Sequence, residues 1–198
     1  MTKIGVIAIQ GNVSEHVTAL EKTLAERGER GEVVTIKHRG IVESCDALAI
    51  PGGESTTIGR LMQRERMFEE IKTAVAENDI PILGTCAGLV LLAKEGVEDS
   101  VKTGQPLLGL MDTTVKRNAF GRQRESFEVS LPMSIFDEPF PAVFIRAPDI
   151  THAAENVEVL ATFDEHIVAA QQGKLLALSF HPELTEDRRI HHYFIDLV

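Results

Sequence analysis

The sequence has few cysteines, a shortage of positive charge and no long hydrophobic run. Its 198 residues include only two cysteines, Cys45 and Cys86, which allow at most one disulfide bond. That number is low for a small secreted scaffold and ordinary in a reducing cytosol. Lysine and arginine total 20 against 30 acidic residues, and the net charge of −10 argues against nucleic acids and anionic membranes as main partners.

Signals for membranes and for secretion are also missing. No apolar run approaches the roughly 18 residues that a membrane-spanning helix needs. The segment Met1–Val6 enters a strand-like pattern at once, so no signal peptide is expected and a cytoplasmic location is predicted. There is no linker, repeat or low-complexity segment. Hydrophobic residues make up 43% of the chain, enough for a proper core, and residues 1–198 are predicted to form one domain.

The first half of the chain alternates short apolar runs with amphipathic helices. Asn12 is the expected N-cap of the first helix, with Glu15 three residues later in a capping-box-like pair. Strands are predicted over Lys3–Gln10, Glu32–Lys37, Ala47–Ile50 and Ile80–Leu83. Helices are predicted over Val13–Leu24, over Thr56–Asn78 with a break near Arg64, and over Ala87–Glu95. Strands that alternate with helices indicate a parallel sheet.

The second half is richer in strands. A final helix is predicted to begin near its N-cap Thr185, with Glu186 and Asp187 in the first turn. A hairpin turn is expected at Gln172-Gly173-Lys174. The predicted fold is therefore an α/β class with a mostly parallel central sheet, flanking helices and additional antiparallel strands. Those further strands are predicted over Ser126–Leu131, Ala142–Arg146, Val157–Thr162, Ile167–Gln171 and Leu175–Phe180.

The sharpest motif is Gly84-Thr85-Cys86-Ala87-Gly88, which lies between a predicted strand and a predicted helix. It matches the G-x-nucleophile-x-G turn, with cysteine in place of serine. The glycines allow a sharp turn that exposes the sulfur, and the positive end of the following helix favours the thiolate. The alternative is a small buried cysteine between glycines that pack helix on strand. Cys45 lacks this context and is interpreted as structural.

A second motif, His181-Pro182-Glu183, follows a predicted strand. A residue before proline is pushed toward extended geometry, in which alternate side chains point the same way. Glu183 is therefore expected behind the His181 ring, as a Cys–His–acid triad requires. A solvated loop with a stray histidine is the alternative. No Cys/His spacing suits zinc. The weaker candidates are His16, His38, His152, His166, His191 and His192.

A third motif, Pro51-Gly52-Gly53-Glu54-Ser55-Thr56-Thr57, again separates a strand from a helix. Glycine-rich turns of this kind aim backbone N–H groups at an anion. A nucleotide-binding loop would need Gly-Lys-Ser/Thr, whereas Glu54 would repel phosphate and attract an ammonium group. The donors therefore suit a transient oxyanion. A tight turn with a Ser/Thr cap is the alternative.

Together these motifs resemble the class I, triad-type glutamine amidotransferases, which have a flavodoxin-like fold. Gly5–Gly11 also matches, and Pro51–Thr57 with Arg117–Gln123 narrow the resemblance to the glutaminase subunits of pyridoxal 5'-phosphate synthase. The resemblance implies that Cys86 is the nucleophile, that His181 is general base and acid, and that Glu183 orients His181. It implies an oxyanion hole from Gly53 and Ala87 and places Gln10 near it, at the face that meets the synthase. The implied glutamine-binding residues are Gly53, Glu54, Ser55, Arg117, Ile145 and Arg146.

The resemblance further implies hydrolysis of L-glutamine to L-glutamate and ammonia, with ammonia passed to a barrel-shaped synthase subunit. No cofactor is expected. Three alternatives remain: a glutaminase of another pathway such as imidazole glycerol phosphate synthase, a cysteine hydrolase or peptidase, and a non-enzymatic module in which Cys86 is a redox sensor. Arginines in Arg117–Arg124 could contact RNA, which the net charge of −10 opposes.

Overall fold

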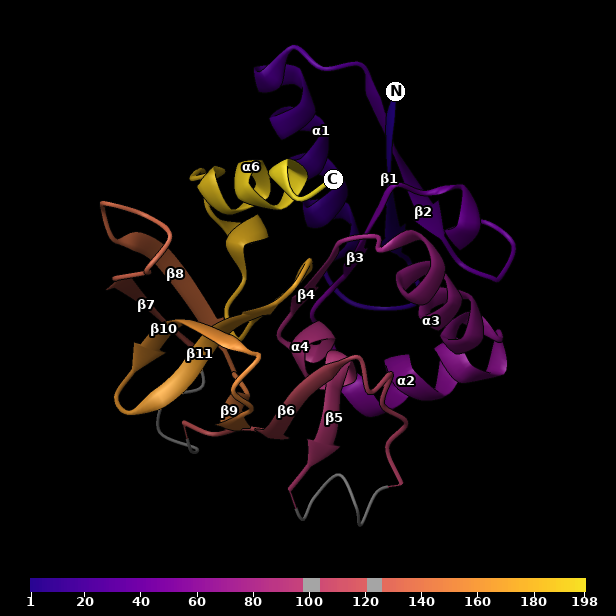
Figure 1. The fold of residues 1–198 in the computed structure, drawn as a ribbon. Coiled ribbons are helices and arrows are strands. Elements are labelled where there is room, and N and C mark those ends of the chain that lie inside the picture. The colour runs from indigo at the N-terminus through magenta and orange to yellow at the C-terminus, as the bar shows by residue number, and fades with distance from the viewer. Residues whose placement is uncertain (98–103, 121–125) are drawn as a thin grey trace.

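A ten-stranded sheet runs through the computed structural model, which describes residues 1–97, 104–120 and 126–198 (Figure 1). Five neighbouring strands are parallel, in the order β2-β1-β3-β4-β12. Four of them come from the first half of the chain, and β12 returns from the second. They are β1 (Thr2–Ile7), β2 (Gly31–Ile36), β3 (Ala47–Ile50), β4 (Ile82–Thr85) and β12 (Leu175–Leu178).

The sheet continues beyond β12 with mainly antiparallel pairs, in the order β11-β9-β6-β5. One further strand, β10 (Glu158–Phe163), pairs with β11, and β7 (Ser126–Leu131) forms a separate two-stranded sheet with β8 (Phe140–Ile145). The mixed parallel and antiparallel sheet confirms the predicted fold class. The continuing strands are β11 (His166–Gln172), β9 (Asp149–Ala153), β6 (Met111–Lys116) and β5 (Ala93–Gly96).

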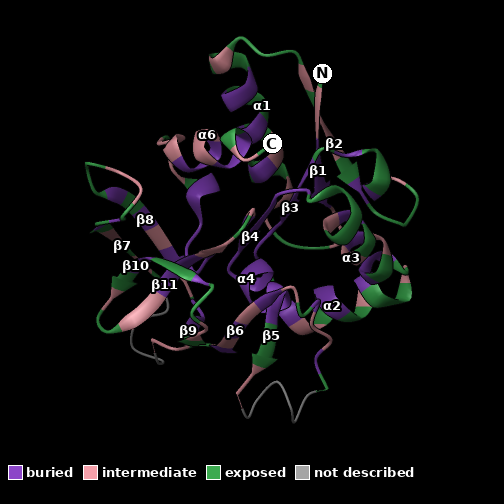
Figure 2. Ribbon diagram, in the orientation of Figure 1, coloured by how far each residue is buried: buried purple, intermediate pink, exposed green. Residues whose placement is uncertain are grey.

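Helices cover the parallel strands from both sides (Figure 1). One buried cluster joins β3 and β4 to α2 (Ser55–Arg64), α3 (Met67–Asn78) and α4 (Ala87–Leu92). A second cluster joins the other side of the same strands to α1 (Val13–Arg27), α6 (Arg189–Asp196) and β8. The central strands and α4 are accordingly buried, while outward turns of α3 are exposed (Figure 2).

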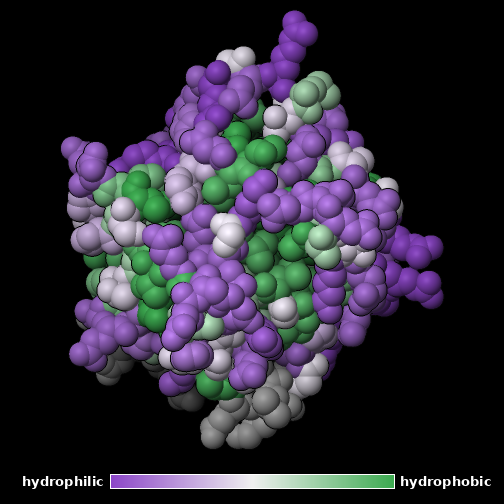
Figure 3. Space-filling view, viewed as in Figure 1, coloured by the Kyte–Doolittle hydropathy of each residue, from purple (hydrophilic) through white to green (hydrophobic). Residues whose placement is uncertain are grey.

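On the face drawn in Figure 3, hydrophobic residues gather near the middle of the molecule and are bordered by hydrophilic ones. Within the described ranges, no helix combines the length and the apolar character needed to cross a membrane.

Several predicted boundaries are wrong for identifiable reasons. The helix predicted over Ala87–Glu95 ends at Leu92, because Ala93–Gly96 pairs with β6 as a strand. Strand pairing here overrides the helix propensity of Ala-Lys-Glu. The last helix begins at Arg189, and Thr185 is not its N-cap: the Thr185 hydroxyl donates to the carbonyls of Pro182 and Asp187. Strands β6 and β9 were not predicted.

The break inside the long helix of the first half is present. Helix α2 ends at Arg64 and α3 begins at Met67, with Arg66 between them in the left-handed conformation at φ 58°. The predicted hairpin at Gln172–Lys174 is also present: β11 and β12 are antiparallel, and Gly173 has a φ of 57°.

Candidate active site

The three sequence motifs meet at one edge of the sheet. Strands β3, β4 and β12 are parallel neighbours, and each is followed directly by one of the motifs. Strand β1 lies next to β3 in the sheet, and the segment that follows β1 approaches the same edge. Carboxyl ends of parallel strands form the usual ligand-binding crevice of open α/β sheets. The topology therefore assembles the site before any side chain is considered.

Cys86 occupies a strained turn between β4 and α4. Its φ of 50° and ψ of −99° lie outside the regions that non-glycine residues ordinarily adopt. The Cys86 N–H donates to the Leu178 carbonyl at 2.7 Å, which fixes the turn against β12. The sulfur lies 3.8 Å from the Ile145 carbonyl oxygen. Such strain is typical of a nucleophile elbow.

The glycines around Cys86 are required by close packing. A Cβ atom on Gly88 would collide with the Ile50 carbonyl oxygen of β3, and one on Gly84 would lie 2.8 Å from the Gly88 carbonyl oxygen. These contacts let α4 lie directly against the strands. The first N–H groups of α4, including that of Ala87, lie at this turn and have no acceptor inside the helix.

His181 and Glu183 form a buried pair, although not through the extended segment predicted from the sequence. Pro182–Leu184 is a turn of 3₁₀ helix, η2, and His181 Nδ1 lies 2.8 Å from Glu183 Oε1 across that turn. The backbone N–H of His181 donates to the Val143 carbonyl of β8, which holds the backbone of His181 in place. The carboxylate is an acceptor only, so Nδ1 carries the hydrogen and Nε2 is directed to the site.

Electrostatics favour the charged form of both partners. Burial alone would lower the pKa of His181, but hydrogen bonds to Cys86 and Glu183 raise that pKa to about 10. Burial would likewise raise the pKa of Glu183, but the neighbouring His16 and His181 hold it well below its usual range. The site therefore favours an imidazolium between the Glu183 carboxylate and the Cys86 sulfur, a pattern typical of catalytic groups.

The loop after β3 is held close to Cys86 and His181 by two glycines. A Cβ atom on Gly52 would collide with Cε1 of His181 and lie 3.4 Å from the Cys86 Cβ. Gly53 has a φ of 153° and lies against Gly11, whose own Cβ would collide with the Gly52 carbonyl oxygen. The Gln10 side chain accepts a hydrogen bond from the Glu54 N–H at 3.1 Å. The predicted proximity of Gln10 to this loop is therefore present.

Glu54 has partners other than the ammonium group expected from the sequence. Its carboxylate caps α2 by accepting from the N–H groups of Thr56 and Thr57, and it pairs with Arg117 at 2.9 Å. Partial burial would raise the pKa of Glu54, but the hydrogen bonds from Thr57 and Thr56 lower it to about 2. The Gln105 amide oxygen accepts from Arg117 and from the hydroxyls of Ser55 and Thr56.

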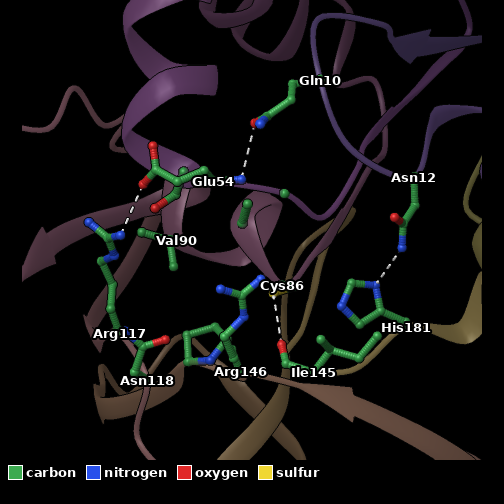
Figure 4. Close-up of a pocket in the computed structure, with 14 residues that line it drawn as sticks. Gln10, Asn12, Glu54, Cys86, Val90, Arg117, Asn118, Ile145, Arg146 and His181 are labelled. Atoms are coloured by element: carbon green, nitrogen blue, oxygen red, sulfur yellow. Dashed lines mark hydrogen bonds and ion pairs between the residues drawn. The ribbon is translucent and has the colours of Figure 1, made fainter. Parts of the chain in front are cut away.

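A cavity of about 380 Å³ lies between these segments (Figure 4). Ten of the eleven predicted site residues line it, and Glu183 lies behind His181. Among the residues that the structure describes, no group of His, Cys, Asp and Glu side chains could hold a metal ion. The lining residues are Gln10, Asn12, Gly53, Glu54, Ser55, Cys86, Ala87, Val90, Arg117, Asn118, Ile145, Arg146, Pro148 and His181.

Comparison with known proteins agrees with this geometry. Residues 6–198 match the family model described as the SNO glutamine amidotransferase family. The chain belongs to this family. A protein of Methanococcoides burtonii is 62% identical over 194 residues, 98% of each chain, and one of Archaeoglobus fulgidus is 53% identical over 195 residues, 98% of each. Both are named pyridoxal 5'-phosphate synthase subunit PdxT.

A crystal structure titled glutamine amidotransferase superimposes on this member of the SNO family with a TM-score of 0.86 and 44% identity. The match covers 98% of this chain and 97% of the other. The resemblance drawn from the motifs is thereby confirmed, and so is the class of enzyme, a glutamine amidotransferase.

In this SNO-family chain, sequence reasoning missed two side chains that contact His181 or Glu183. Asn12 stands at the predicted N-cap position of α1, but its side chain makes no capping hydrogen bond. Its amide donates to Glu183 Oε1 at 3.2 Å. The same amide nitrogen lies 3.3 Å from His181 Nδ1, a contact drawn in Figure 4. The second is His16, whose Nε2 lies 3.4 Å from the same carboxylate oxygen. Within the Arg117–Gln123 motif, residues 121–123 lie outside the described residues, as does Arg124 of the segment considered for RNA contact.

Proposed function

We propose that this chain is a glutaminase subunit that hydrolyses L-glutamine to L-glutamate and ammonia through Cys86, His181 and Glu183. The observation that carries the proposal is the arrangement of three side chains. The strained Cys86 and His181 line the cavity in contact with each other, and His181 Nδ1 lies 2.8 Å from Glu183 Oε1. Membership in a glutamine amidotransferase family supplies the substrate class.

The first half-reaction forms a thioester. The Cys86 thiolate attacks the γ-carboxamide carbon, and the carbonyl oxygen gains negative charge opposite the N–H groups of Gly53 and Ala87. Losing one such donor typically raises the barrier by about 3 kcal/mol. Imidazolium His181 gives its Nε2 proton to the amide nitrogen, the C–N bond breaks, and ammonia leaves. The raised pKa of His181 keeps that proton available at neutral pH.

The second half-reaction regenerates the site. Neutral His181 takes a proton from water, the resulting hydroxide attacks the thioester carbon, and the C–S bond breaks. Glutamate leaves, and the thiolate and imidazolium are restored together. Glu183 remains ionised throughout and holds the ring in one tautomer. No step requires a cofactor.

Recognition of free glutamine is proposed to fall on Glu54, Ser55, Arg117, Ile145 and Arg146, all on the cavity wall. The two arginines differ in their surroundings. Arg117 is paired with Glu54 at 2.9 Å, whereas Arg146 has no ion pair among the residues that the structure describes. Its side chain extends into the cavity beside Cys86 (Figure 4). A guanidinium binds a carboxylate through two parallel N–H donors, so Arg146 is the better placed partner for the substrate carboxylate.

The ammonia is proposed to pass to the barrel subunit of pyridoxal 5'-phosphate synthase, because close relatives carry that enzyme's subunit name. Ammonia is a nucleophile only when it is unprotonated, and contact with water at neutral pH would protonate it. Its transfer is therefore proposed to occur inside the protein complex. Gln10 is proposed to lie at the docking face. A cytoplasmic location belongs to the same proposal, since both cysteines are free and a reducing compartment preserves the Cys86 thiol.

The test measures glutamate release by the purified chain with and without a pyridoxal 5'-phosphate synthase barrel subunit, for wild type, Cys86→Ala and His181→Asn. We expect release by the wild type, stimulated by the barrel subunit, and loss in both variants. Cys45→Ala is the matched control, because Cys45 is the other buried free cysteine and lies away from the cavity. Full glutaminase activity in Cys86→Ala would overturn the assignment.

A further inference from the structure

A buried histidine behind the triad links its acid to the strand that carries the nucleophile. His16 lies in the second turn of α1 and is 0% exposed. Its Nε2 atom lies 2.9 Å from the Thr85 hydroxyl oxygen and 3.4 Å from Glu183 Oε1. Thr85 is the last residue of β4 and directly precedes Cys86. One ring nitrogen therefore contacts two segments that each carry a triad residue.

The chemistry of Glu183 and Thr85 indicates that Nε2 of His16 acts as a hydrogen-bond donor. A carboxylate only accepts hydrogen bonds, so an attractive contact with Glu183 requires a hydrogen on Nε2 of His16. The same N–H group can be shared with the Thr85 hydroxyl oxygen, which also accepts. The nearest groups thus impose one orientation on the His16 ring.

The Glu183 carboxylate is held from three sides. Oε1 accepts from His181 Nδ1, which follows β12, and from Asn12 Nδ2, and it faces His16 Nε2; Asn12 and His16 both stand at the start of α1. Oε2 is buried without a partner among the described residues, so rotation of the carboxylate would sacrifice these contacts without replacing them. His16 thereby limits where Glu183, and hence the His181 ring, can sit relative to Cys86.

We propose that His16 is a positioning residue of the glutaminase reaction, whose Nε2–H group ties the Glu183 carboxylate to the Thr85 hydroxyl and so fixes the separation of acid and nucleophile. The inference rests on the proposed function. It differs from a purely structural role, in which a buried histidine only fills space between α1 and the sheet. Small displacements of catalytic groups are costly, since about 1 Å can reduce the rate about 100-fold.

The experiment compares kcat, KM for glutamine and melting temperature of His16→Phe, His16→Gln and Thr23→Val, each with the synthase barrel subunit present. Phenylalanine fills the space without a donor, whereas the glutamine amide can place an N–H close to the position of Nε2. Thr23 is the matched control: it lies on α1, is 0% exposed, and its hydroxyl donates to Ala19 within the helix, away from the site.

We expect His16→Phe to lower kcat about tenfold or more with KM within about twofold. His16→Gln should recover most of kcat, and Thr23→Val should keep it despite a lower melting temperature. If His16→Phe does not fold, Thr85→Val removes the second partner of Nε2 and should lower kcat without a change in KM.

Wild-type kcat in His16→Phe would overturn the inference, as would equal kcat losses in His16→Phe and His16→Gln. For an unfolded His16→Phe, an unchanged kcat in Thr85→Val would overturn it. Failure of the proposed function is distinguishable, because the wild type itself would then release no glutamate.

Discussion

At the scale of single residues, the decisive feature is the placement of charge around one imidazole. His181 is buried, which by itself disfavours its charged form, yet contacts with Cys86 and Glu183 raise its pKa to about 10. The ring is therefore a proton donor over the whole physiological range. This is what departure of ammonia requires, because an amide nitrogen leaves only after it is protonated.

The role of Glu183 can be tested by the pH dependence of kcat/KM. The reaction needs protonated His181, so activity should fall as pH rises through the pKa of that ring. Glu183→Gln removes a negative charge that stabilises the imidazolium, so this pKa falls and the alkaline limb moves to lower pH by about one to three units. Glu186→Gln, an exposed control, should leave the limb in place. An unmoved limb in Glu183→Gln would show that the carboxylate does not govern His181.

The two arginines of the cavity should behave differently. Arg146→Gln is expected to raise KM for glutamine about tenfold or more with a smaller effect on kcat, because it removes a charged hydrogen-bond partner of the substrate. Arg117→Gln should change KM less and lower the melting temperature, since it breaks the pair with Glu54. Steady-state kinetics of both variants check this, and a larger KM effect for Arg117→Gln would reverse the assignment.

At the scale of elements, the sequence predicted best where local pattern and tertiary pairing agree. Strand β3 has the predicted limits Ala47–Ile50, since an apolar run this short, bounded by Pro51, is typical of a buried strand and too short for a helix. The prediction of secondary structure failed where a neighbouring strand, and not the local sequence, determines the conformation. Ala93–Gly96 has helix-forming residues but pairs with β6, and Lys94 reaches Asp112 on that strand at 3.0 Å.

The turn at Cys86 should carry measurable strain. A non-glycine residue at φ 50° and ψ −99° costs about 1–3 kcal/mol. Cys86→Gly should therefore be more stable than Cys86→Ala by about 1 kcal/mol, although both are inactive, because glycine adopts this backbone freely. Denaturant unfolding measures the difference. Ala87→Gly, inside α4, should instead lose about 1 kcal/mol, and a Cys86→Gly variant less stable than Cys86→Ala would contradict the strain.

At the scale of the whole molecule, the meeting of the proposed triad residues was predictable, whereas their contacts with Asn12 and His16 were not. Cys86 and His181-Pro182-Glu183 stand in local motifs, each following a strand, so parallel order brings them together. Asn12 and His16 stand in no such motif. The Asn12 contact with Glu183 spans 171 residues, and only the packing of α1 against η2 creates it. The sequence pattern correctly predicted the N-cap position of Asn12 but not the contact of its side chain with Glu183.

Docking of the synthase subunit is expected to act through the segment after β1. Gln10 accepts from the Glu54 N–H next to the proposed oxyanion donor Gly53, so a partner that contacts Gln10 can align this loop. Gln10→Ala should reduce the stimulation of glutamate release by the barrel subunit by a larger factor than it lowers the activity of the free chain. Lys174→Ala, at the opposite end of β12, serves as control. Undiminished stimulation in Gln10→Ala would show that the segment after β1 takes no part in the response to the barrel subunit.

The most direct test of the account is to trap the covalent intermediate. The chain, with its synthase subunit, is mixed with glutamine, quenched in acid within the turnover time, digested and analysed by mass spectrometry. We predict a γ-glutamyl thioester on the peptide that contains Cys86, and none on the peptide that contains Cys45. Steady glutamate release with no acyl group on Cys86 at any quench time, or the same release from Cys86→Ala, would contradict the account.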